Sequence, residues 1–181
     1  MILTGDSILD FNFCQFVDNH ILSDSLVSLV LLKDEQKFIN QKLKYLNSEQ
    51  EINIFGYRSN KQSDGGYKEL VFHARKFEDK DSIDEEKIYL SRKLLNNCAN
   101  MDIIYNHDDI NLYVFNRSIY AVLEDEKVNK LNTIKSDLIP YLVNNFYNLR
   151  LRNIVAKNKR NEKPEKSLKI MGLLLEGNNY A

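Results

Sequence analysis

Cysteine and proline are scarce in this 181-residue chain, and its charges nearly cancel. The two cysteines, Cys14 and Cys98, lie far apart, so neither a disulfide framework nor a zinc knuckle is expected. Lysine and arginine together number 25, against 26 aspartates and glutamates. The chain as a whole therefore has no electrostatic field that would attract nucleic acid or a membrane surface.

Long hydrophobic runs are absent as well. The longest, residues 26–32, is interrupted by Ser28 and is far shorter than the ~20 residues that a membrane-spanning helix needs. Free thiols without a signal peptide are typical of the cytosol. We therefore expect a soluble cytosolic protein with no membrane partner.

Strand and helix patterns alternate over a length that suits one domain. Strands are predicted at 1–4, 26–32, 51–57, 67–75, 87–90, 101–105, 109–115 and 168–175, and helices at 11–21, 33–50, 94–101, 116–125 and 133–147. Asp10 is the predicted N-cap of the first helix. The first strand is expected to be buried and to form a parallel crossover with the second. Strands 51–57 and 67–75 are predicted to form a hairpin, and the alternation favours an α/β fold with a mostly parallel sheet.

Three segments are expected along the chain. Residues 1–149 are predicted to form a partial α/β domain. Residues 150–167 are rich in Lys, Arg, Asn and Glu and contain Pro164, which is typical of a basic flexible linker. No aromatic residues interleave these charges, so the linker is not expected to bind RNA. Residues 168–181 are predicted to return to the same domain as a terminal strand.

One run combines a proline with a helical apolar pattern. Residues 133–143 read Thr-Ile-Lys-Ser-Asp-Leu-Ile-Pro-Tyr-Leu-Val, with apolar side chains at i, i+4, i+7 and i+8 from Ile134. Pro140 removes a backbone donor and is expected to kink or split this helix. The run resembles the stretch that closes the nucleotidyltransferase-like domain in the gamma subunit of eukaryotic translation initiation factor 2B.

Three further stretches resemble that family in the same order. Residues 1–6 resemble the strand and Gly-Asp motif shared by sugar nucleotidyltransferases. Residues 54–56, 70–74 and 82–86 resemble a strand pair with its acidic connection, and residues 109–115 resemble the strand and tyrosine that precede a helix. The resemblance covers most of residues 1–150. It implies the C-terminal part of a doubly wound, Rossmann-like domain, so we expect a fragment that lacks the front half of its domain.

The resemblance also implies a function. In the gamma subunit the domain is non-catalytic and supports guanine-nucleotide exchange on initiation factor 2. It pairs with the similar domain of the epsilon subunit and helps to dock the substrate factor. The implied partners are the epsilon and other subunits of initiation factor 2B, and initiation factor 2 itself. No catalytic residue, cofactor or direct nucleic-acid contact is implied.

The motifs of the related enzymes are largely missing. Asp6 matches the Gly-Asp carboxylate that binds magnesium in the enzymes, although aspartate is also a common turn residue. The enzymes' Glu-Lys-Pro motif, which holds the sugar phosphate, is matched at 73–77 by His-Ala-Arg-Lys-Phe, without the acid or the proline. A Glu-Lys-Pro at 162–164 lies in the basic segment and is interpreted as a chance match. The second metal carboxylate would fall where the sequence stops, at 179–181.

Other chemically active residues are given structural interpretations. His20 and His73 are predicted to be packed or hydrogen-bonded. His107, next to Asp108 and Asp109, is interpreted as a polar turn rather than a metal cluster, and Cys14 as core filling.

Two alternatives to the exchange-factor interpretation stay open. One is a sugar-nucleotide pyrophosphorylase, such as a mannose-1-phosphate guanylyltransferase, which would use magnesium, a nucleoside triphosphate and Asp6 as a metal ligand. The other is an unrelated α/β interaction domain.

Overall fold

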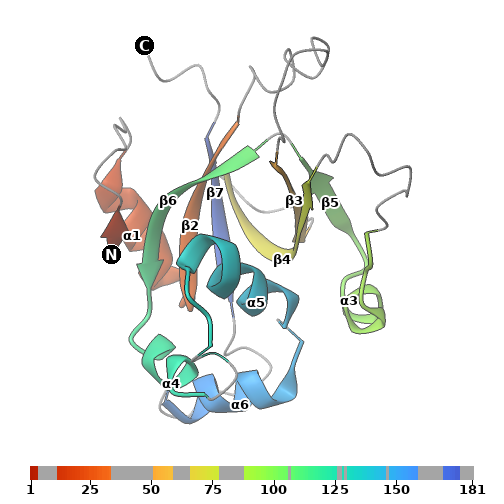
Figure 1. The fold of residues 1–181 in the computed structure, drawn as a ribbon. Helices are drawn as coiled ribbons and strands as arrows, with labels where there is room; N and C mark the ends of the chain where they lie inside the picture. Colours follow the sequence, from red (N-terminus) through yellow and green to blue (C-terminus); the bar gives the residue numbers. More distant parts are fainter. Residues whose placement is uncertain are drawn as a thin grey trace.

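The computed structural model describes residues 1–3, 12–33, 51–58, 66–77, 88–105, 107–125, 128, 130–145, 147–158 and 169–175. Within them, a seven-stranded sheet has the order β1-β6-β2-β7-β4-β3-β5 (Figure 1). The strands are β1 (Ile2–Leu3), β2 (Val27–Lys33), β3 (Glu51–Arg58), β4 (Tyr67–Phe77), β5 (Met101–Ile104), β6 (His107–Phe115) and β7 (Ile170–Leu175). The helices are α1 (Phe13–Leu22), α3 (Arg92–Asn97), α4 (Ile119–Leu123), η2 (Ile134–Leu138), α5 (Ile139–Asn144) and α6 (Leu149–Asn158).

The direction of the strands departs from the prediction. Among the described strands, five of the six pairings are antiparallel, and β2 with β7 is the parallel one. The α/β class is confirmed, but the expectation of a mostly parallel sheet is wrong. The physical reason is that β6 runs against both of its neighbours, and that a hairpin connection forces β3 and β4 to pair antiparallel.

The first crossover has the predicted direction. β1 and β2 both run antiparallel to β6, so they are parallel to each other with β6 between them. The prediction that the first strand is buried is wrong, because β1 lies at the sheet edge, where Met1 and Ile2 are exposed. β2 lies between β6 and β7, and its first five residues are buried. The hydrophobic run at 26–32 is therefore an interior strand.

Most of the other predicted elements are confirmed, with shifted ends. The hairpin of β3 and β4, the strands β5, β6 and β7, and the helices α1, α3 and α4 all appear. The strand expected at 87–90 is wrong for residues 88–90, which form no regular element. Of the helix expected at 33–50, Lys33 is instead the last residue of β2, and the rest lies outside the described residues. Among the described helices, none is long and apolar enough to cross a membrane.

Helices cover both faces of the sheet. On one face, α4, α5 and α6 bury Val122, Leu142 and Val155 against the central strands (Figure 1). On the opposite face, α1 buries Phe16 against Val30 and its neighbours on β6 and β7. A third apolar cluster lies beneath α3 and includes residues of the β3–β4 hairpin. The sheet is thus the middle layer of an α/β/α arrangement.

The N-cap of α1 is Asn12, not Asp10 as predicted. The Asn12 side chain accepts a hydrogen bond from the Gln15 backbone N–H at 3.0 Å. We expect Asn12→Ala to lower the free energy of unfolding by about 1 kcal/mol, because an orphan N–H of the first turn loses its acceptor. Urea unfolding followed by circular dichroism measures the change. Asn12→Asp keeps an acceptor and serves as the control, and equal loss in both variants would contradict the capping role.

The helix predicted at 133–147 is split rather than kinked. Its first turn, η2, is a π-helical turn in which the Leu138 N–H donates to the Thr133 carbonyl, five residues back, at 3.0 Å. α5 follows with Pro140 in its first turn, where a missing N–H is tolerated. Pro140 cannot donate to the carbonyl of Lys135, and that carbonyl accepts instead from Arg75 Nη2 at 3.1 Å. Pro140 therefore leaves the Lys135 carbonyl without a donor in the helix, and Arg75 of β4 supplies the donor.

The basic segment after residue 149 begins as a helix. The interpretation of residues 150–167 as a flexible linker is wrong as far as residue 158, where α6 ends. Leu151 and Val155, four residues apart, are buried in the main core, and Arg150 forms a 2.8 Å ion pair with Asp125. A stripe of so few apolar residues is a weak sequence signal, and tertiary packing supplies the stability of such a helix. The remainder of the expected linker lies outside the described residues.

Candidate functional site

The hairpin of β3 and β4 gathers polar side chains on one face. Antiparallel pairing sets Phe55 opposite His73 and Asn53 opposite Arg75, so the four side chains share that face. The His73 ring stacks on Phe55 with centroids 4.7 Å apart and planes inclined by 4°. His73 Nε2 lies 3.3 Å from Asn53 Oδ1, and Asn53 Nδ2 donates to Asp108 Oδ1 at 3.4 Å. Because a carbonyl oxygen only accepts, this arrangement assigns the proton of the neutral imidazole to Nε2.

His73 is held neutral. Its side chain is 4 % exposed, and burial, followed by the charges of Arg75 and Lys135, lowers the pKa of His73 to about 4. Its Nδ1 has no hydrogen-bond partner among the residues that the structure describes. The imidazole is therefore a buried acceptor with little tendency to take up a proton.

A second polar group lies at the start of β6. Asp109 accepts hydrogen bonds from the Tyr113 hydroxyl at 2.7 Å and from the Asn111 backbone N–H at 2.8 Å. Asn111 has a φ of 60°, and the pairing of β6 with β2 shifts register here, as in a β-bulge. Lys135 Nζ donates to the Asp109 carbonyl at 2.7 Å. The bulge thus directs the Asp109 carboxylate into the protein interior.

Burial changes the protonation of this group. It raises the pKa of Asp109, although the hydrogen bonds from Tyr113 and Asn111 oppose the rise. Burial, followed by the charge of Asp109, raises the pKa of Tyr113. Both carboxylate oxygens are already engaged, so Asp109 is suited to hold the fold together rather than to exchange protons with a substrate.

A pocket of about 420 Å³ lies next to the hairpin. We call it the β4 groove. Residues 71–75 of β4 form one wall, η2 and α5 form a second with Ser136, Pro140, Val143 and Asn144, and Tyr89, Ser91 and Leu94 form a third. Tyr147 closes one end and accepts a hydrogen bond from Arg58 Nη2 at 2.7 Å. Arg75 gives the described lining a positive charge, so the groove is suited to a ligand with an anionic group.

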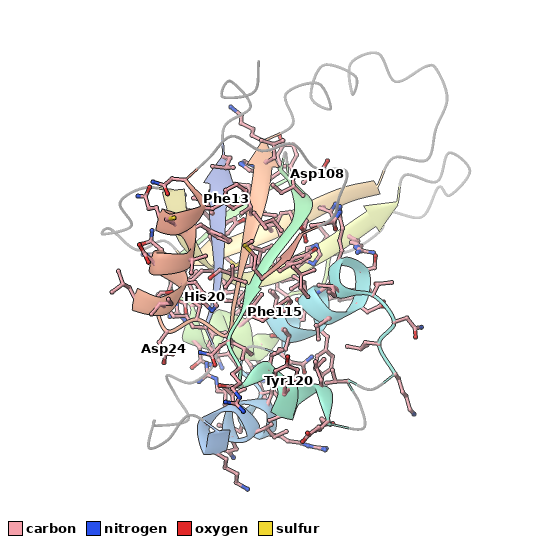
Figure 2. The ribbon with its side chains drawn as sticks, turned by 90° about the vertical axis from the view of Figure 1, so that its left-hand side faces the viewer. Phe13, His20, Asp24, Asp108, Phe115 and Tyr120 are labelled. Carbon is pink, nitrogen blue, oxygen red and sulfur yellow. The ribbon has the colours of Figure 1, made fainter. Side chains whose placement is uncertain are left out.

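The residues singled out in the sequence do not converge on one site. Asp6 lies outside the described residues. His20 is buried with Nδ1 2.8 Å from Ser28 Oγ, which confirms a packed histidine. Figure 2 shows His20 on α1 and Asp108 towards the opposite end of β6 from Phe115. Among the described residues, no group of three His, Cys, Asp or Glu side chains could hold a metal ion.

Two of these interpretations are wrong. His107 and the aspartates after it form the start of β6, paired with β2, rather than a turn. Strand pairing begins earlier than predicted because β2 extends to Lys33 and offers partners there. Cys14 is exposed rather than part of the core, because it lies on the outer side of α1 from Phe16.

The residues that the sequence analysis missed are Asn53, Arg75, Lys135 and Asn144. Two of them carried a signal. In a strand, every second residue lies on the same face, so the sequence already places Asn53 on the face of Phe55, and Arg75 on the face of His73. Lys135 and Asn144 carried no sequence signal, because their hydrogen-bond partners lie on β6 and β4, which are distant in sequence.

Neither a scan of protein-family models nor a search of curated proteins gives a significant match to this chain.

Proposed function

We propose that this chain is a non-catalytic, pyrophosphorylase-like part of the gamma subunit of translation initiation factor 2B. In that role it supports guanine-nucleotide exchange on initiation factor 2 by subunit assembly and docking in the cytosol. The observation that carries the proposal is the packing of the Leu-Ile-Pro run against the hairpin. Arg75, the residue after the resembling stretch 70–74, donates to the Lys135 carbonyl, which lies in the Leu-Ile-Pro run and to which Pro140 cannot donate.

The order of the elements also supports the proposal. β6 carries Tyr113 and is followed by α4 and then by η2 and α5, as the resemblance implies. At the place of the enzymes' Glu-Lys-Pro motif, β4 carries Ala74 and Arg75, and Arg75 is bonded to Lys135. This hydrogen bond to the Lys135 carbonyl is internal to the fold, which suits a domain that acts through its surface.

An assembly surface is suggested by exposed apolar side chains. Five of the large exposed ones fall within residues 88–105, at the β5 end of the sheet, namely Ile88, Tyr89, Leu95, Ile103 and Tyr105. β5 is an edge strand next to α3 (Figure 1). Gatherings of exposed apolar residues commonly mark protein interfaces. We propose that the epsilon subunit contacts this end.

The test is recovery of the complex from cells that carry the full-length protein tagged at its own locus. We expect stoichiometric recovery of the epsilon and other exchange-factor subunits, and of initiation factor 2, identified by mass spectrometry. Ile103→Lys should reduce recovery of the epsilon subunit at least about tenfold, because it places a charge in an apolar contact. Leu22→Lys, on exposed α1 at the other end of the sheet, is the matched control and should leave recovery unchanged.

The outcome that would overturn the proposal is recovery of the tagged protein alone. That outcome would favour the alternative, a magnesium-dependent sugar-nucleotide pyrophosphorylase. One observation favours it: β1, β2 and β7 run in the same direction, so their carboxyl ends share one end of the sheet, where open α/β sheets bind ligands. Gly5 and Asp6 follow β1 in the sequence. Under the alternative, Asp6→Ala would abolish magnesium-dependent turnover, whereas under the proposed function it would leave recovery of the complex unchanged.

A further inference from the structure

Three large apolar side chains are exposed at the end of the molecule that α4 and α6 form. Tyr120 and Leu123 of α4 are 66 % and 39 % exposed, and Leu149, the first residue of α6, is 68 % exposed. Tyr120 and Leu123 are three residues apart, so their side chains are neighbours on the helix surface. Figure 2 shows Tyr120 on α4, and Figure 1 shows α6 beside that helix. We call the surface around these three side chains the α4–α6 face.

An ion pair joins the two helices at this face. Arg150 Nη2 lies 2.8 Å from Asp125 Oδ2, so the start of α6 is held against the end of α4. Leu149 precedes Arg150 directly, and Leu123 precedes Asp125 by two residues. The ion pair therefore brings these two exposed leucines near each other. The opposite sides of both helices enter the main core, through Ile119, Val122, Leu151 and Val155.

Exposed cations flank the apolar side chains. Arg117 lies in the turn that leads into α4, where its carbonyl accepts a hydrogen bond from the Tyr120 N–H at 3.2 Å. Its side chain is therefore on the same side of the helix as that of Tyr120, three residues later. On α6, Lys157 lies two turns after Leu149 and is also exposed. Positive charge thus lies on both sides of the apolar centre.

The ion pair adds to this positive charge. The side chain of Arg150 is 61 % exposed and that of Asp125 is 7 % exposed, so the pair presents mainly its cation to solvent. Within residues 116–125 and 147–157, all of which the structure describes, Glu124 is the exposed acid. An occupant with carboxylates around an apolar stripe would complement this surface.

We propose that the α4–α6 face binds an acidic amphipathic helix of a partner protein. The apolar stripe of that helix covers Tyr120, Leu123 and Leu149, and its carboxylates face Arg117 and Lys157. This surface is distinct from the β5 end, at which we propose that the epsilon subunit binds (Figure 1). The inference therefore goes beyond the proposed function and does not depend on it.

RNA and a lipid surface match the α4–α6 face less well. Proteins that bind single-stranded RNA stack successive bases on several aromatic side chains, whereas Tyr120 is the one exposed aromatic residue that the structure describes on these two helices. An anionic membrane would meet Glu124 with the same sign of charge, whereas a protein helix can place a hydrogen-bond donor there.

The experiment uses the full 181-residue chain and a fluorescent peptide of about four helical turns, built from leucine, glutamate and alanine. Its leucines are spaced three and four residues apart, so that they form one stripe. Binding is followed by fluorescence anisotropy, and we expect it to be saturable. A peptide of the same composition with its leucines spread around the helix, and one with lysine for glutamate, should each bind at least about tenfold more weakly.

Two pairs of substitutions in the chain separate the apolar contacts from the charged ones. Leu149→Ser should weaken binding of the leucine-glutamate peptide by at least about tenfold, whereas Leu22→Ser, at an exposed leucine of α1, should leave it unchanged. Arg117→Glu should weaken binding by about threefold or more, with a larger effect at low salt. Lys93→Glu, at an exposed lysine of α3, is its matched control. Thermal unfolding of each variant checks that the fold is kept.

Three results would overturn the proposal. The first is no binding of the leucine-glutamate peptide at millimolar concentration. The second is equal affinity of Leu149→Ser and Leu22→Ser for that peptide, which would place the contact elsewhere on the chain. The third is sedimentation of the chain with phosphatidylserine vesicles that Leu149→Ser abolishes and the peptide does not inhibit, which would make this face a lipid-binding surface. Failure to recover exchange-factor subunits from cells would leave all three results unaffected, so the two proposals fail separately.

Discussion

When the pH is lowered from about 7 to about 4, the free energy of unfolding of the wild-type protein is expected to fall by about 3 kcal/mol more than that of His73→Phe. His73 has a pKa of about 4 in the folded protein, against an ordinary value of 6.5. The main cause is burial, and the cations Arg75 and Lys135 add to it. Phenylalanine keeps a ring that can stack on Phe55 but cannot take up a proton.

The sign follows from the proton balance. Between the two pKa values, the unfolded chain binds a proton at His73 and the folded protein does not, so acid favours unfolding. The contribution of His73 is fully present above the unfolded pKa and is lost as the pH falls towards the folded value. Asp109 acts in the opposite sense, because its pKa is raised on folding and its protonation in acid favours the folded state. Asp109 is present in both proteins, so their difference isolates His73.

The measurement is urea unfolding of wild type and His73→Phe at several values between about pH 7 and pH 4. Val122→Ala is the control, because it lowers stability through the fully buried core without removing a titrating group and should lose stability with acid as the wild type does. Parallel loss of stability in wild type and His73→Phe would show that burial does not hold the imidazole neutral.

Replacing Asp109 by alanine is the second large effect, with an expected loss of about 3 kcal/mol in the free energy of unfolding at neutral pH. The substitution removes the acceptor of the Tyr113 hydroxyl and of the Asn111 N–H. Tyr113 is 2 % exposed, so its hydroxyl cannot turn to water. The Asn111 side-chain oxygen, 3.4 Å from that hydroxyl, is a poor replacement.

Asp109→Asn is the matched control for this prediction. The amide keeps an acceptor oxygen and can also donate to the Tyr113 hydroxyl, so we expect it to lose no more than about 1 kcal/mol. Because the pKa of Asp109 is raised, the stability of wild type relative to Asp109→Asn should increase as the pH falls. Urea unfolding at neutral and acidic pH measures both effects. Equal loss in the alanine and asparagine variants would show that the carboxylate does not hold Tyr113.

Much of the local structure could be predicted from the sequence. The alternation of apolar and polar residues predicted β3 and β4, and the helical spacing from Phe13 predicted α1, because each pattern reports the face that the segment buries. The proline at 140 correctly predicted that the helix around it would not continue unchanged. The α/β class followed from the order of these patterns.

The pairing of the strands could not be predicted in the same way. The direction of β6 depends on which strands it meets, and those strands are far apart in sequence. The α6 helix was missed because its apolar stripe consists of few residues, and its stability comes from the core that they enter. The capping of α1 by Asn12 rather than Asp10 shows that helix ends are uncertain by a residue or two.

In the candidate site too, the local geometry followed from the sequence, whereas the long-range contacts did not. The sequence by itself determined that His73 and Arg75 share one face of a strand and that Pro140 leaves a carbonyl without its helical donor, because both follow from the local geometry of the chain. Only the tertiary structure decided that Arg75 reaches this carbonyl and that η2 and α5 lie beside β4, where they line the groove with it. These contacts join residues that are distant along the chain, and their formation depends on how all the layers pack together.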